Sequence, residues 1–267
     1  MTVRYHPELA LMDAAATYVF CVAHRATPLT FRGVDSGMPA GSAPRALAFA
    51  PRLWLIASQV PLSMYGPGSI DGRLNDLDWV SAAALAHDAV VERTGRLRGA
   101  TVVPMKLFTM FSTPEKAVEA MRARKAEIDA VVKRVRGCSE WGVRVVRATS
   151  TADAPARRLD SGTAFLQAKK QARDRSHEDG RRAAAAAASI YQDLGRAAKQ
   201  ARRRPSPDGA AAPPLLDAAF LVSDTGAAKF KTLVRKAGQA CRAAGAELTL
   251  TGPWPPYNFV EGGEVLA

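Results

Sequence analysis

Hydrophobic and polar positions over residues 17–108 predict strands interrupted by turns. The β-branched and aromatic run Thr17 to His24 predicts a first strand. Two further apolar runs, Ala46 to Ala50 and Leu53 to Val60, are separated by a Pro-Arg pair and predict the strands of a hairpin. The run Thr101 to Phe108 predicts another strand, with a bulge or sheet edge at Pro104 because proline cannot donate to a ladder.

Helical spacing alternates with these runs. Apolar residues recur every three or four positions from Leu77 to Gly95, with Leu77 itself assigned to the inward stripe, which predicts an amphipathic helix. A hydroxyl followed by proline opens a second helix that is expected to run from Pro114 to about Val135. A last strand is predicted over Trp141 to Val146. This order predicts an α+β sandwich with a largely antiparallel sheet, similar to a modified ferredoxin-like fold, over residues 1–147.

The second half predicts a different domain. Residues 148–160 have the composition of a linker. A helix capped by Ser161 is expected to continue toward Arg204, with Gly180 as a point where it could divide. Its apolar stripes lie near its two ends, while its middle is charged and faces either solvent or a partner. A strand, a helix and a second strand follow, at residues 215–222, 227–243 and 247–251, which completes a C-terminal α+β domain over residues 161–267.

Three prolines and three large aromatic residues stand close together in the segment TGPWPPYNF near the C-terminus. Proline restricts its own backbone and that of the preceding residue, so the segment is expected to be stiff and extended. Its rings either pack on their own domain as a structural clasp, the favoured interpretation, or dock a partner protein. The candidate residues are Trp254, Pro255, Pro256, Tyr257 and Phe259.

The composition indicates a globular protein able to bury a core. The chain has 267 residues, of which 48% are hydrophobic, without an apolar run long enough to span a bilayer. We expect it to be soluble and cytoplasmic, since no secretory signal pattern begins the sequence. Cys21, Cys138 and Cys241 show no metal-binding spacing, so they are interpreted as buried thiols in a reducing compartment.

Positive charge is concentrated in one segment. The net charge is +12, and residues 157–204 hold 13 Lys and Arg against 5 Asp and Glu. A basic contact face is predicted at Arg181, Arg182, Arg202, Arg203 and Arg204. The alternatives are a solvated face, or nucleic-acid binding by a basic helix over residues 181–204 through counterion release. No stacking platform or reading helix accompanies these arginines, which disfavours nucleic acid.

Catalytic groups that could converge are not evident. His87 and Asp88 are adjacent on a predicted helix, so their side chains point about 100° apart, and a histidine satisfied within the fold is the simpler interpretation. The glycine-containing loop GVDSGMPAG lacks the Lys-Ser/Thr of a phosphate-binding loop. We therefore expect a protein that is not an enzyme and has no cofactor or metal.

An ordered set of landmarks resembles the gas vesicle GvpL/GvpF family over nearly the whole chain. The segments that carry the resemblance are TYVFCVAH, LNDLDWVSAAALAHDAVVE, TVVPMKLFTMF, SEWGVRVV, SGTAFLQAKK and, most specifically, LTGPWPPYNFV. One departure is TVVPMKLFTMF, which stands where a glycine-containing stretch would be typical. Another is the alanine- and arginine-rich helix.

The resemblance implies a non-enzymatic accessory or minor structural protein of gas vesicles. It implies contacts with the small hydrophobic shell protein and with other accessory proteins during assembly. It also implies an N-terminal modified ferredoxin-like domain and a C-terminal α+β domain with long helices, which agrees with the domains predicted from the residues.

Overall fold

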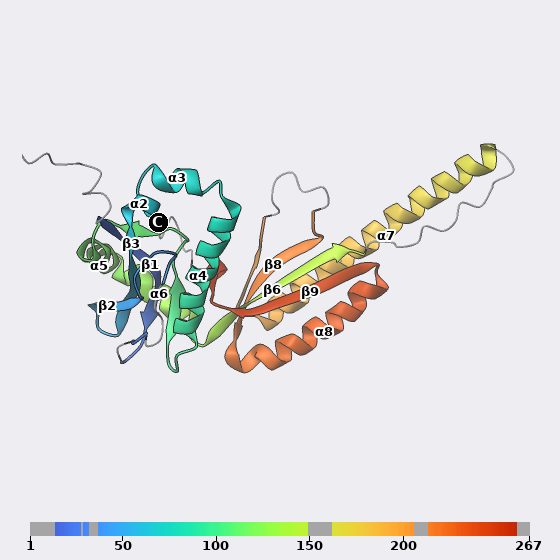
Figure 1. Ribbon diagram of the computed structural model, residues 1–267. Coiled ribbons are helices and arrows are strands. Elements are labelled where there is room, and N and C mark those ends of the chain that lie inside the picture. Colours follow the sequence, from blue (N-terminus) through green and yellow to red (C-terminus); the bar gives the residue numbers. More distant parts are fainter. Residues whose placement is uncertain (1–13, 28, 32–36, 149–161, 206–212, 261–267) are drawn as a thin grey trace, which may run out of the picture. The chain divides into compact units, whose positions relative to one another are not determined.

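The computed structural model describes residues 14–27, 29–31, 37–148, 162–205 and 213–260 (Figure 1). The chain divides into two compact units. The first comprises Met1–Gly137 together with Pro255–Ala267, and the second comprises Cys138–Trp254. Each unit has its own antiparallel sheet and its own helices, so the predicted α+β class is confirmed.

The first unit is built on a five-stranded antiparallel sheet of order β2-β3-β1-β4, with β5 also pairing with β1. Its strands are β1 (Ala15–His24), β2 (Arg45–Ala50), β3 (Leu53–Pro61), β4 (Thr101–Pro104) and β5 (Met110–Phe111). Strand β1 is central and buried along almost its whole length, because it is covered on both faces. That position explains why its sequence is continuously apolar instead of alternating. The predicted hairpin is β2 and β3.

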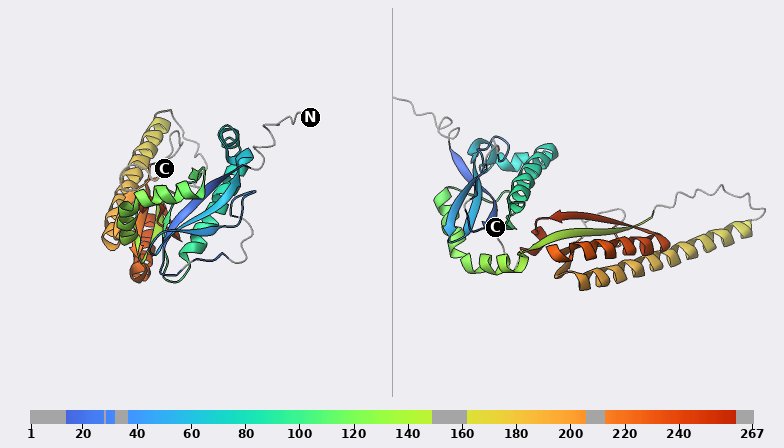
Figure 2. Two further views of the ribbon diagram at one scale, coloured as in Figure 1. Left: turned by 90° about the vertical axis from the view of Figure 1, so that its left-hand side faces the viewer. Right: turned by 90° about the horizontal axis from the view of Figure 1, so that it is seen from below.

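In the described residues five helices accompany this sheet, with α4 on one face and α5 and α6 on the other (Figures 1 and 2). They are α2 (Leu62–Tyr65), α3 (Ser69–Arg73), α4 (Leu77–Gly95), α5 (Pro114–Ala123) and α6 (Lys125–Val135). Helix α4 begins where the Asp76 carboxylate accepts hydrogen bonds from the N–H groups of Asp78 and Trp79. It buries Ala83, His87, Val90, Val91 and Thr94.

Two predicted elements of the first unit differ from the structure. The strand expected to reach Phe108 ends at Pro104, and Phe108 has a φ of 64°, which no strand residue can adopt. The helix expected over residues 114–135 is two helices, because Arg124 between them has φ −102° and ψ 16°. Thr113 caps the first of the two through its hydroxyl, as predicted.

The second unit is a four-stranded antiparallel sheet of order β7-β8-β6-β9, with both of its long helices on one face (Figure 2). Its elements are β6 (Cys138–Arg147), α7 (Gly162–Ala197), β7 (Gln200–Arg203), β8 (Leu216–Ser223), the 3-10 turn η1 (Asp224–Gly226), α8 (Ala227–Ala243) and β9 (Ala246–Trp254). The predicted strand 215–222, helix 227–243 and strand 247–251 are confirmed. The strand β7 was not predicted, since QARR has neither β-branched nor aromatic residues.

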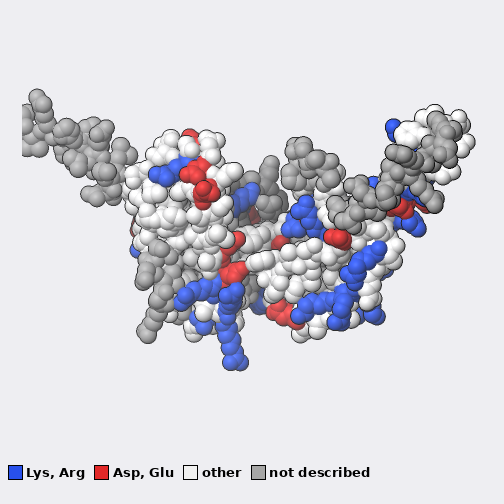
Figure 3. Space-filling model, turned by 45° about the vertical axis from the view of Figure 1, so that its right-hand side comes forward, with Lys and Arg blue, Asp and Glu red and all other residues white. Residues whose placement is uncertain are grey.

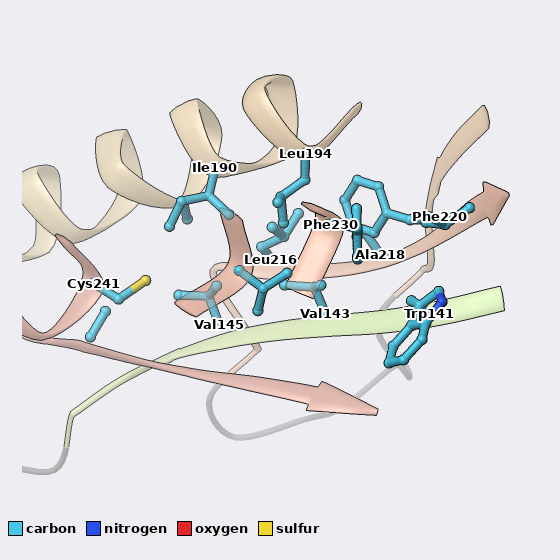
Figure 4. Close-up of a cluster of buried hydrophobic side chains, with 14 of the residues drawn as sticks. Trp141, Val143, Val145, Ile190, Leu194, Leu216, Ala218, Phe220, Phe230 and Cys241 are labelled. Atoms are coloured by element: carbon cyan, nitrogen blue, oxygen red, sulfur yellow. The ribbon is translucent and has the colours of Figure 1, made fainter. Parts of the chain in front are cut away.

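The core of the second unit lies between the sheet and the two helices (Figure 4). Phe220 from β8 and Phe230 from α8 are fully buried, with ring centroids 5.5 Å apart. Trp141 from β6 lies beside Phe230 at 6.4 Å. Helix α7 contributes Ile190 and Leu194, which belong to the apolar stripe expected near its C-terminal end.

Helix α7 is one uninterrupted helix of 36 residues, so Gly180 does not divide it and the helix ends before Arg202. The Arg147 guanidinium donates to the carbonyl of Ser176 and approaches Gly180. The part of the helix before Gly180, residues 162–179, is here called the α7 arm. It extends past the sheet (Figure 1), and its Phe165 and Leu166 are 56% and 66% exposed, so the first predicted stripe is not buried.

The unit boundaries differ from the predicted domains 1–147 and 161–267. Strand β6 belongs to the second unit because it pairs with β8 and β9, which come later in the chain. The segment after Trp254 belongs to the first unit. Of the predicted linker 148–160, all but residue 148 lies outside the described residues. The ferredoxin-like description of the first unit stays a prediction.

Two identical substitutions in the second unit should have very different effects on stability. We expect Phe230→Ala to lower the free energy of unfolding by about 3–5 kcal/mol, because it removes a fully buried ring from a packed core. Phe165→Ala, on the exposed arm, should change it by about 0.5 kcal/mol or less. Urea denaturation of both variants tests this, and equal losses would contradict the placement of either ring.

Candidate functional site

The C-terminal candidate segment folds onto the first unit, to which it belongs. Chain residues after β9 form a 3-10 turn, η2 (Tyr257–Phe259). Phe259 is fully buried, and its carbonyl accepts a hydrogen bond from Arg134 Nε at 3.0 Å. The Tyr257 hydroxyl donates to Asp88 Oδ1 at 2.6 Å, across 169 positions of sequence. These contacts are those of a structural clasp.

Trp254 does not share in this clasp. Its side chain is 45% exposed, and it lies at the end of β9 opposite Glu140 of β6. Pro256 is buried and Pro255 half-buried, so the enclosed part of the segment begins after the tryptophan. The expectation of a buried Trp254 is therefore wrong, whereas Tyr257 and Phe259 contact the first unit and their role as a clasp stays a prediction.

Tyr257 adjoins a buried aromatic cluster centred on His87. The imidazole is 2% exposed, and its Nδ1 lies 2.7 Å from the Tyr18 hydroxyl. The Phe108 N–H donates to the same hydroxyl at 3.3 Å, so the tyrosine can donate its own proton to Nδ1. In this arrangement the imidazole of His87 is neutral, and its Nδ1 accepts a hydrogen bond from the Tyr18 hydroxyl. His87 is therefore a buried core histidine with a hydrogen-bond partner at Nδ1, and it does not face Asp88.

Burial controls the ionisation of this cluster. Desolvation lowers the pKa of His87 to about 4, although the neighbouring Asp88 carboxylate opposes that change. Desolvation also raises the pKa of Tyr257, and the hydrogen bond to Asp88 raises it further. At neutral pH the phenol is therefore protonated and available as the donor in the clasp.

The basic candidates do not form one helical face. Arg181 and Arg182 lie exposed on α7, whereas Arg202 and Arg203 lie on β7, with Arg204 just beyond it. The predicted basic helix 181–204 is thus wrong, because the chain leaves the helix after Ala197 and returns as a strand.

Several of these arginines have partners within the unit. Arg204 pairs with Asp217 at 2.6 Å, and Arg203 lies over the ring of Tyr191 at 4.5 Å. Arg182 pairs with Asp179. On the face seen in Figure 3, Lys and Arg side chains are spread over the second unit and are interrupted by Asp and Glu. This distribution differs from a continuous phosphate-binding stripe.

Sequence patterns missed an open sheet edge. Strand β9 pairs only with β6, and no strand of the described ranges pairs with its outer side. The bond from the Ala148 N–H to the Gly245 carbonyl fixes the alternation of the antiparallel ladder. By that alternation the backbone groups of Leu248 and Leu250 point away from β6. A strand can be predicted from the sequence, but its place at the edge depends on pairing.

An exposed apolar face on α4 was also missed. Leu77 and Leu85 are 77% and 72% exposed, whereas the sequence pattern assigned Leu77 to the buried stripe. The signal available in the sequence was Leu85, which lies outside the stripe formed by Ala83, Val90 and Val91. Apolar residues therefore occur on both sides of this helix.

In the described ranges, no group of three or more His, Cys, Asp or Glu side chains is placed to bind a metal ion. All three cysteines are free, and burial raises the pKa of Cys21 to about 12, which leaves that thiol unreactive. Cys138 is only partly buried. Over the same ranges, no helix combines the length and apolar character needed to cross a membrane.

The described residues form two α+β units, with an open sheet edge on β9 and exposed apolar side chains on α4. The family model described as gas vesicle synthesis protein GvpL/GvpF matches residues 16–261. The chain belongs to the GvpL/GvpF family. A relative from Streptomyces sp. (strain CB03234), gas vesicle protein L, is 29% identical over 229 residues, which cover 82% of this chain and 84% of that protein.

Two crystal structures share the fold. The gas vesicle protein GvpF from Anabaena sp. PCC7120 aligns with a TM-score of 0.65 at 13% identity, covering 94% of this chain and 100% of that one. The GvpF from Microcystis aeruginosa aligns with a TM-score of 0.62 at 12% identity, covering 92% and 99%. The sequence resemblance to this family is confirmed.

Truncation of the C-terminal segment should separate the clasp from the exposed tryptophan. We expect Phe259→Ala to lower the free energy of unfolding by about 3–5 kcal/mol, because the ring is fully buried. Trp254→Ala should cost less than half as much, since 45% of that side chain is already in water. Urea denaturation monitored by circular dichroism measures both. A larger loss for Trp254→Ala would contradict the clasp.

Burial of His87 should make stability fall in acid. Its pKa is about 4 in the folded chain and about 6.5 when unfolded, so the unfolded chain takes up the proton first as the pH falls. The resulting contribution, up to about 3 kcal/mol, is present above pH 6.5 and is lost between pH 6.5 and 4. Denaturation of wild type and His87→Gln across this range should give a steeper pH dependence for wild type. Parallel curves would exclude the assignment.

Proposed function

We propose that this protein is a gas vesicle accessory or minor structural protein that binds the small hydrophobic shell protein and other accessory proteins during assembly. Family membership supports a role in gas vesicles. The proposal places the chain in the cytoplasm and at the gas vesicle, and it assigns binding without catalysis. Its first unit would correspond to the modified ferredoxin-like domain that the family resemblance implies.

The observation that carries this proposal is the outer edge of β9. Ala246, Leu248 and Leu250 point their backbone donors and acceptors away from β6, where no strand of the described residues pairs with them, and the stretch up to Thr251 has no proline or positive charge to block them. An extended segment of another protein can add to such an edge by backbone hydrogen bonds, with little demand on its side chains. Leu248 and Leu250 pack against the core beneath the edge, so an added strand would find an apolar margin beside it.

Other sheet edges are less suited to this role. On β2 the Phe49 carbonyl already accepts a hydrogen bond from Arg122 Nε at 3.0 Å. Strand β7 is four residues long and carries Arg202 and Arg203, and both shortness and charge discourage strand addition. Strand β4 ends in a proline. The longest unobstructed edge in the described residues is therefore β9.

Charge on the second unit complements this mode of binding. An aggregation-prone shell subunit has to stay hydrated while its backbone is paired. The α7 arm and α8 carry exposed Lys and Arg side chains in the same unit as β9. They would keep a complex with an apolar subunit soluble.

A pull-down of the small gas vesicle shell protein tests the proposal. Leu250→Pro removes an outward N–H from the β9 edge, and Leu250→Ala loses the same side chain but keeps that donor. We expect wild type and Leu250→Ala to capture the shell protein at both moderate and high salt. Leu250→Pro should capture at least about fivefold less, the loss of roughly one net backbone hydrogen bond. Circular dichroism must show that both variants are folded.

Random duplex DNA as competitor addresses the alternative of nucleic-acid binding. Capture of the shell protein by an edge should persist in the presence of duplex and at high salt, whereas phosphate binding weakens steeply with salt. Equal capture by the proline and alanine variants would reject the β9 edge. No capture of the shell protein, together with tight and salt-sensitive binding of duplex, would reject the proposed function itself.

A further inference from the structure

Large apolar side chains are exposed at three places in the described residues. Leu74, Leu77 and Leu85 lie on or beside α4, Phe165 and Leu166 lie on the α7 arm, and Trp254 ends β9. Exposed apolar groups that cluster on a helix are typical of contact surfaces. The two helical clusters differ in the charges that surround them.

Acidic side chains accompany the leucines of α4. At 100° per residue, its exposed face comprises Leu77, Ser81, Leu85 and Ala89, with three acids, Asp78, Asp88 and Glu92. No basic residue of α4 lies within this face. Asp88 also accepts the Tyr257 hydroxyl, and Glu92 pairs with Arg96. The face is therefore apolar and negative, and it is here called the acidic α4 face.

The α7 arm has the opposite character. Its Phe165 and Leu166 share one side of the helix with Lys169, Lys170 and Arg173, all of them exposed. The acids of the arm, Asp174, Glu178 and Asp179, project to other sides. Arg173 lies 3.8 Å from Asp174, an exposed pair that costs little to separate. This side of the arm is therefore apolar and positive, and it is here called the basic arm face.

We propose that the basic arm face of one copy of this protein binds the acidic α4 face of a second copy. Each face presents two large apolar side chains and three charges, and the charges are opposite in sign. Such complementarity selects the partner and speeds association, while the apolar side chains supply the attraction that salt does not screen. We infer a second copy as the partner because the same chain carries both complementary faces.

The two faces are different surfaces, so the contact is heterologous, and each copy that uses its arm can offer its acidic α4 face to another copy. Contacts of this head-to-tail kind form rings where the rotation between copies closes and chains where it does not. This self-association goes beyond the proposed function, since it needs neither the shell protein nor the β9 edge.

Sedimentation velocity of the purified full chain over a concentration series tests the proposal. One variant reverses the arm, with Lys169, Lys170 and Arg173 changed to Glu. The other reverses α4, with Asp78, Ser81 and Ala89 changed to Lys. Wild type should sediment faster as concentration rises at low salt, and each variant alone should show a dissociation constant raised at least about tenfold.

Mixing the two variants is the decisive step. An equimolar mixture brings an acidic arm together with a basic α4, and a basic arm with an acidic α4, so association should return. A control matched to the arm variant changes three basic residues of α8 to Glu, as Lys229→Glu, Arg235→Glu and Lys236→Glu. It should associate like wild type. A wild type that stays monomeric at every concentration, an arm variant that associates normally, or a mixture that does not recover would each overturn the proposal.

Discussion

The antiparallel pairing of β6 with β9 is the constraint on which the chain's organisation depends. Strand β6 is the first element of the second unit and β9 is its last, so the ladder joins the start and end of that unit side by side. All other elements of the second unit, including both long helices, lie between these two paired strands in the sequence. Because the ladder ends with Glu140 opposite Trp254, the chain leaves the unit where it entered. That exit returns Tyr257 and Phe259 to the first unit.

Much of the fold could be predicted from local patterns, because most strands and helices here obey their own periodicity. The hairpin, α4, α8 and the central strand β1 follow directly from apolar spacing. Errors occurred where pairing between distant segments decided the outcome. The weakly β-forming QARR became β7 through its partner β8, and β6 joined strands that come much later. Solvent exposure was more difficult to predict than secondary structure. Leu77 and Trp254 have the side chains of core residues, but the segments around them leave both exposed.

The candidate site shows the same division between local and distant information. The proline-rich segment was expected to be stiff and extended, and it is extended as part of β9 up to Trp254 but forms a 3-10 turn at Tyr257–Phe259. Which of its rings is buried depends on Asp88 and Arg134, residues from other parts of the chain. The arginines were counted correctly, but their separation between α7 and β7 could not be read from composition. The surfaces that support the proposals are the β9 edge, the acidic α4 face and the basic arm face, and each depends on which described segments pack against it.

The hydrogen bond from Arg147 to the Ser176 carbonyl fixes the base of the α7 arm to strand β6. Eleven residues separate Ser176 from Phe165, a rise of about 16 Å at 1.5 Å per residue. The arm is thus a spacer of fixed length, ordered by its own helical hydrogen bonds. A partner bound at Phe165 would be held about 16 Å along the helix from Ser176, where Arg147 contacts the arm. The arm would therefore set a distance as well as provide a contact. Insertion of four residues would lengthen that distance by about 6 Å and rotate the tip by about 40° about the helix axis.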